Sequence, residues 1–191
     1  MVWALLGKAQ GHAIQEIEDS QSERIVAIVG GAMLDDTLRR TLEHRLRKHK
    51  DINKKLFKPS GALGALGPKV DLAFQMYVVD KEVRNAMYGL SEVRNLFAHN
   101  LDASFDSKSV KMIEALAKLT LHDGKTVYPS PFTGKDSLYK IETITDSRAK
   151  FLVNLKMALI FLMKDRLGHQ PHSSLPTTTP IVEVSARTIA S

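Results

Sequence analysis

Three polar residues near the middle of the chain could together bind and cleave a phosphodiester. They are Arg94, Asn95 and His99 of the segment RNLFAH. Arginine matches the geometry of a phosphate group, and histidine exchanges protons near neutral pH. The same side chains could instead fix one helix within a bundle. The choice between these roles depends on the helices that position the three side chains.

The residues leading up to this segment are typical of an amphipathic helix that begins after Asp80 and ends near His99. Arg94 falls inside the apolar arc of this helix, about 20° from Met87. Asn95 and His99 are neighbours on a different face. We therefore expect Arg94 to turn toward the bundle and the other two to turn outward. The apolar face itself holds Val83, Met87, Leu90, Val93 and Phe97.

An arginine on an apolar face needs an anionic partner, because an unpaired buried charge is costly. Asp35 precedes Leu38 and Leu42 at helical spacing, so it shares their apolar stripe. We predict a buried ion pair between Arg94 and Asp35, with Asp36 as the second choice. Such a carboxylate could also hold the arginine in place for a substrate phosphate.

A strongly basic segment covers residues 39–58. It holds nine Lys or Arg residues against two acidic ones, so the rest of a chain whose net charge is +6 is close to neutral. Two interpretations stay open: binding to a phosphate backbone, or a solvated helix end where cations suit the helix dipole. The candidate nucleic-acid-binding residues are Arg39, Arg40, Arg45, Arg47, Lys48, Lys50, Lys54 and Lys55.

Hydrophobic periodicity predicts an all-α fold, a multi-helix bundle formed by a single domain over residues 1–167. Residues 122–145 are expected to be irregular, with room for a small hairpin, and residues 168–191 to form a flexible tail. The expected helices cover 20–49, a short stretch from Pro68, 81–99, a stretch from a cap at Ser107 or Asp106 to about 121, and 147–167 after a cap at Asp146. The last of these is apolar on more than one face. It belongs in the core or in a subunit interface, so a homodimer stays open.

Several functional classes lack their residues in this sequence. There is no Cys, which excludes disulfides and thiolate chemistry, and the seven His form no ligand cluster. We find no phosphate loop, dinucleotide fingerprint or nucleophile elbow, so no metal or cofactor is expected. The sequence shows neither a signal peptide nor an apolar run long enough to span a membrane. We therefore expect a cytoplasmic protein.

Three blocks of the sequence resemble the mannitol operon repressor family. They are SERIVAIVGGAMLDDTLRRTL, PKVDLAF and VRNLFAHNLDASFD, which occur in this order within residues 20–120. The resemblance implies an all-α fold and a role in restraining the expression of sugar-alcohol uptake genes. A repressor that binds DNA itself needs an element that enters a groove, and we find no helix-turn-helix. Sequence-specific DNA binding is therefore not expected, and a protein partner or RNA fits better.

The segment RNLFAH also resembles the signature of the broader HEPN superfamily, in which an Arg and a following polar residue stand shortly before a His. Here four residues separate Arg94 from His99. Nuclease members of that superfamily cut RNA without a metal. The resemblance would assign His99 to proton transfer at the 2′-hydroxyl and Arg94 to the charged phosphorane. Other members only bind or act as scaffolds, so the signature alone does not make this chain an enzyme.

The sequence thus favours a regulator of the mannitol repressor type that acts through protein or RNA contacts. The alternative is a metal-independent endoribonuclease. Arg94 and His99 lie roughly 140° apart on an ideal helix, so a single helix cannot easily direct both side chains at one phosphate. A two-fold dimer could combine an Arg from one subunit with a His from the other. The enzyme therefore requires such a dimer, whereas the regulator does not.

Overall fold

The computed structural model describes residues 3–121 and 146–166, which form seven α-helices and no strands. This confirms the all-α prediction. The predicted hairpin within 122–145 and the predicted tail at 168–191 lie outside the described residues. The helices are α1 (Trp3–Asp19), α2 (Glu23–Arg45), α3 (Lys50–Phe57), α4 (Leu66–Gln75), α5 (Lys81–His99), α6 (Val110–Ala117) and α7 (Ser147–Arg166).

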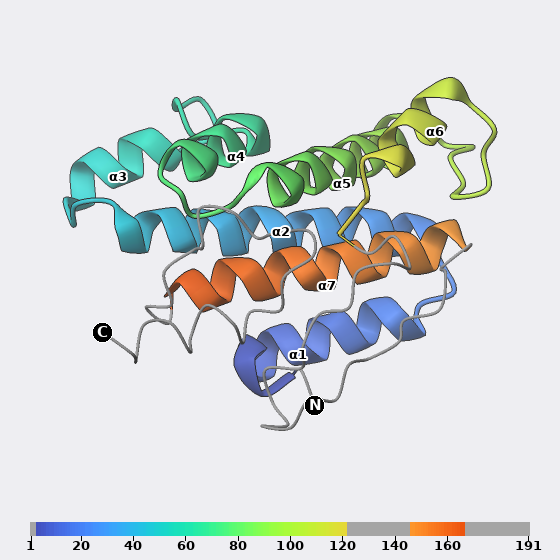
Figure 1. Cartoon of the computed structure of the whole chain (residues 1–191), viewed down its shortest axis with the longest axis horizontal. Coiled ribbons are helices and arrows are strands. Elements are labelled where there is room, and N and C mark those ends of the chain that lie inside the picture. The colour runs from blue at the N-terminus through green and yellow to red at the C-terminus, as the bar shows by residue number, and fades with distance from the viewer. Residues whose placement is uncertain (1–2, 122–145, 167–191) are drawn as a thin grey trace, which may run out of the picture.

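Helix α2 is the centre of the bundle. It lies alongside α7 across the middle of the molecule, with α1 on one side and α4 and α5 on the other (Figure 1). Helix α6 packs against α5, and α3 follows α2 at its C-terminal end. Both central helices contribute fully buried side chains, among them Leu34, Leu38, Phe151 and Leu159. Within the described residues, no helix is both long enough and apolar enough to span a membrane.

The helix boundaries follow capping residues. Asp80 caps α5 by accepting a hydrogen bond from the Val83 amide, and Asp146 caps α7 through the Ala149 amide, as the sequence predicts. Helix α6 begins later than predicted, because Ser109 rather than Ser107 or Asp106 supplies its cap. Helix α1 was not predicted at all.

The predicted helix over 20–49 is two elements in the structure. Helix α2 ends at Arg45, and Leu46 takes an extended conformation. Helix α3 then starts after His49, whose imidazole accepts a hydrogen bond from the Ile52 amide. This local cap allows the basic segment to turn and begin a second, short helix rather than extend the first one.

Two consecutive glycines let α2 approach two other helices at once. A Cβ atom on Gly30 would lie 2.8 Å from Leu155 Cδ2 and 3.1 Å from Phe151 Cε1, both on α7. A Cβ atom on Gly31 would lie 2.5 Å from Cγ of Arg94 on α5. Real Cβ atoms do not come so close, so a side chain at either position would push a neighbouring helix or its side chain away.

The start of α2 holds the end of α5. The Arg24 guanidinium donates hydrogen bonds to the carbonyl oxygens of Phe97, Asn100 and Leu101. Phe97 lies in the last turn of α5, and the other two residues follow that helix. A carboxylate oxygen of Glu23 accepts a hydrogen bond from the Phe105 amide at 3.1 Å. The Arg24 contacts satisfy carbonyl groups at and after a helix end, and the Glu23 contact satisfies a backbone N–H group of the loop that follows.

A nearly buried ion pair joins the other end of α2 to α7. Arg45 donates to both carboxylate oxygens of Asp165, through Nε at 2.8 Å and through Nη2. The Asp165 side chain is only 1% exposed, whereas that of Arg45 is 29% exposed. The hydrogen bonds to Asp165 raise the pKa of Arg45 above its usual value. Because Asp165 is almost inaccessible to water, Arg45 supplies the partner that its buried carboxylate needs.

We predict that Arg45→Ala lowers the free energy of unfolding by about 3 kcal/mol, because it leaves a buried carboxylate without a partner. Urea denaturation followed by circular dichroism measures this. Arg40→Ala is the control, since Arg40 forms an exposed pair with Asp36 on the same helix and should cost less than about 1 kcal/mol. Adding Asp165→Asn to Arg45→Ala should recover part of the loss. If Arg45→Ala and Arg40→Ala lower the free energy of unfolding equally, the buried pair has no special role.

Candidate functional site

A cleft of about 300 Å³ lies where α2, the start of α4 and the second half of α5 meet. Helix α2 contributes Gly31 and Asp35, and α5 contributes Ser91, Arg94 and Asn95. The remaining wall is the end of the turn before α4, with Gly64 and Ala65, and the first two residues of that helix, Leu66 and Gly67.

Two of the three residues of the predicted motif line this cleft. Arg94 and Asn95 are both exposed, and Nη1 of Arg94 donates a hydrogen bond of 2.8 Å to Oδ1 of Asn95. His99 is also exposed but does not line the cleft, because it is the last residue of α5, one turn beyond Asn95. The structure therefore brings Arg94 and Asn95 together and leaves His99 apart.

The predicted burial of Arg94 is wrong. By helical arithmetic the residue lies close to the buried Met87, yet its side chain is exposed. The reason is the residue that faces it: Gly31 has no side chain, so the Cβ and Cγ atoms of Arg94 pass directly over the α2 backbone. The aliphatic stem is covered by packing while the guanidinium reaches solvent at the cleft.

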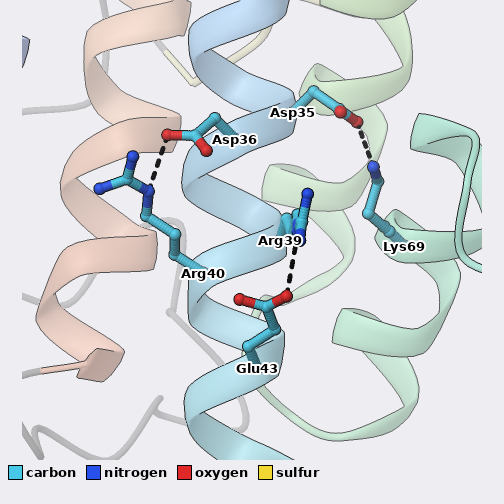
Figure 2. A network of polar contacts seen from close by, with 6 residues as sticks. All are labelled: Asp35, Asp36, Arg39, Arg40, Glu43 and Lys69. Atoms are coloured by element: carbon cyan, nitrogen blue, oxygen red, sulfur yellow. Dashed lines mark hydrogen bonds and ion pairs between the residues drawn. The ribbon is translucent and has the colours of Figure 1, made fainter. Parts of the chain in front are cut away.

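The predicted partner of Asp35 is also wrong. Asp35 pairs with Lys69 of α4, and Oδ1 lies 2.6 Å from Nζ of that lysine (Figure 2). The Lys69 side chain is 2% exposed, and the Asp35 side chain is 40% exposed. A buried ammonium group needs a counter-charge, so this pair ties α4 to α2 beside the cleft, which Asp35 lines and Lys69 does not. Asp36 instead points along α2 to Arg40 at 2.8 Å (Figure 2).

A second cluster, which does not line the cleft, holds α4 against α5. Arg84 donates to Oδ1 of Asp71 from Nε at 3.0 Å and from Nη2 at 2.7 Å. The hydrogen bonds from Arg84, aided by one from Tyr88, lower the pKa of Asp71. The Arg84 guanidinium also lies over the rings of Phe74 and Tyr88. This cluster fixes the position of the α4 wall.

The basic segment divides into paired and unpaired residues. Arg39 pairs with Glu43 at 3.0 Å, Arg40 with Asp36, and Arg45 with Asp165, so these three arginines already have acidic partners. The other five predicted residues are exposed and form no ion pair within the described part of the chain. They are Arg47, Lys48, Lys50, Lys54 and Lys55, on the turn after α2 and on α3.

Sequence reasoning missed Lys69, although a signal for it existed. The segment LGPKVDLAF places Lys69 one turn after Leu66 and one turn before Ala73, which is an apolar position in the helix. The argument that a cation on an apolar face needs a carboxylate applied to Lys69 as well as to Arg94. What the sequence could not show is which of the two cations Asp35 would meet.

The arrangement in one chain can bind a ligand more readily than it can catalyse hydrolysis. Arg94, Asn95 and Ser91 offer hydrogen-bond donors to the cleft, but His99 does not share it. Within residues 3–121 and 146–166, no three His, Asp or Glu side chains come together in a way that could hold a metal ion.

Comparison with known proteins shows the fold. No protein-family model matches the chain, and no curated protein matches it in sequence. A solved structure matches it with a TM-score of 0.56 and 17% sequence identity, over 80% of this chain and 96% of the other. That structure is the X-ray structure of the MtlR–HPr complex from Escherichia coli. The chain therefore shares an MtlR-like helical fold.

We predict that Asp35→Asn lowers the free energy of unfolding by about 2 kcal/mol, because it removes the counter-charge of a buried lysine. The matched control is Asp36→Asn, which breaks an exposed pair on the adjacent residue and should change stability by about 0.5 kcal/mol or less. Urea denaturation of the two variants measures the difference. Similar effects of the two substitutions would show that Lys69 does not depend on Asp35.

Proposed function

We propose that this chain is a regulatory protein of the mannitol repressor type that acts by binding another protein. The observation that carries this proposal is the fold shared with MtlR, a protein that was solved in complex with the protein HPr. The shared region covers nearly all of the MtlR chain. The resemblance of three sequence blocks to the mannitol operon repressor family points in the same direction. HPr is therefore the first partner to test.

The unpaired basic surface of α3 and the preceding turn is our candidate for the contact with this partner. Its five cations are exposed and form no ion pair within the described residues, although Asp51 lies on the same helix, so they are available to an acidic surface. Ile52 lies among them and is 53% exposed, which offers an apolar contact inside a charged rim. Complementary charge raises association rates and selects partners. This combination supports a protein interface on α3.

We predict that the double substitution Lys54→Glu and Lys55→Glu weakens HPr binding about tenfold or more, because it reverses the charge of the proposed interface. Isothermal titration calorimetry with HPr from the same organism measures the affinity. The matched control reverses two exposed lysines, Lys108→Glu just before α6 and Lys111→Glu within it, and α6 lies at the opposite end of the bundle from α3 (Figure 1). This control should leave the affinity unchanged.

Two results would contradict this proposal. If the unmodified chain does not bind HPr, the partner suggested by the shared fold is wrong. If both double variants lose affinity equally, the effect is one of net charge rather than of the α3 surface. The same titration with unrelated RNA oligonucleotides tests the other partner class. Binding of RNA alone, lost in the α3 variant, would assign the basic surface to nucleic acid instead.

The ribonuclease alternative meets a geometric difficulty in a single chain. Arg94 lines the cleft and His99 does not, so one chain does not place both beside the same phosphate. We predict that the purified protein leaves RNA intact in the presence of a chelator. Cleavage with 2′,3′-cyclic phosphate ends that His99→Ala abolishes would establish the enzyme and overturn this prediction.

A further inference from the structure

The geometry points to a binding site for a small oxyanion, the phosphoryl or carboxylate group of a metabolite, in the cleft beside Arg94. This site is separate from the α3 surface, and the inference does not rest on the proposed protein partner. It rests on a cation, Arg94, that the fold holds in place and that has no anionic partner in the part of the chain that the structure describes.

Arg94 is fixed at two points. Its stem lies across the backbone at Gly31, and its Nη1 atom donates to Oδ1 of Asn95 at 2.8 Å. A guanidinium carries five N–H donors, and this is the one hydrogen bond that Arg94 makes within the described residues. The carboxylate in the same cleft, Asp35, is paired with Lys69. The remaining donors of Arg94 are thus oriented but make no hydrogen bond to residues 3–121 or 146–166.

Other groups in the cleft also offer donors. Because Oδ1 of Asn95 accepts the hydrogen bond from Arg94, its amide nitrogen remains as a donor of two further hydrogen bonds. The hydroxyl group of Ser91 lines the same wall. Helix α4 begins within the cleft lining, and the methyl group of its N-cap residue Ala65 cannot accept a hydrogen bond from the first-turn amides, which are those of Leu66 and Gly67 because Pro68 has no N–H. These amides add to a site that the Arg94 side chain defines.

The charges in and beside the cleft favour an anion, although Lys69 itself is buried and does not line it. The carboxylate of Asp35 is matched by the buried ammonium of Lys69, 2.6 Å away. Arg94 then leaves an excess of one positive charge. Arginine forms strong charge-assisted hydrogen bonds with carboxylate and phosphate oxygens, often two at once. An oxyanion therefore suits the cleft better than a cation or a neutral ligand.

The size of the cleft limits the ligand. A volume of about 300 Å³ is at the lower end for small-molecule sites. This matches a metabolite or its anionic group better than a segment of protein. Because His99 does not line the cleft, the inferred function is binding without hydrolysis.

A nuclear magnetic resonance titration of the full ¹⁵N-labelled chain tests the site. The probes are sodium phosphate and sodium acetate, each added at constant ionic strength against sodium chloride. We expect saturable shifts of the amide signals of Gly31, Gly64 and Gly67, which line the cleft. The phosphate and acetate arms show which oxyanion is preferred. Arg94→Ala should weaken binding about tenfold or more, because the charged donor is lost.

The control and a second variant separate this site from a general charge effect. Arg166→Ala removes an exposed arginine at the end of α7 and should titrate like the unmodified chain. Gly31→Ala keeps the guanidinium but displaces its stem, so it should also weaken binding, with a thermal melt to check folding. The inference is overturned if neither probe gives saturable shifts or if Arg94→Ala binds as before. It is also overturned if Arg166→Ala weakens binding as much as Arg94→Ala does.

Discussion

The close approach of three helices at Gly30 and Gly31 is the constraint on which the rest of the bundle depends. Gly30 admits α7, and Gly31 admits the stem of Arg94 from α5. Two glycines in a helix interior cost stability relative to alanine. That cost is offset by the burial of apolar side chains on both flanking helices, including Phe151, Leu155 and Met87.

The three sequence blocks that resemble the mannitol operon repressor family meet one another in space. Arg24, from the first block, caps the end of α5 in the third block. Asp35 of the first block pairs with Lys69 of the second block. Gly31 and Arg94 join the first and third blocks again. These residues therefore define the fold, which explains how the blocks can mark a shared architecture without specifying a reaction.

The cleft follows from the same contacts. The Asp35–Lys69 pair and the Asp71–Arg84 pair hold α4 beside α2 and α5, and Gly31 opens the space that Arg94 crosses. Arg94 therefore has a packed aliphatic stem and an accessible guanidinium at the cleft, whereas His99 at the end of α5 does not line the cleft. A site built in this way favours recognition of a ligand over acid–base chemistry within one chain.

The sequence by itself determined the helical fold and the helices that carry strong caps. Hydrophobic periodicity and capping both depend on residues that lie close together in the sequence. Asp80 and Asp146 are the clearest examples. It also identified Asp35 and Arg94 as charges that need an explanation. Only the tertiary structure decided that Asp35 meets Lys69, that Arg94 emerges over Gly31, and that Arg45 is held by Asp165. Partners between helices depend on how closely the helices approach, and that distance is set by residues far apart in the chain.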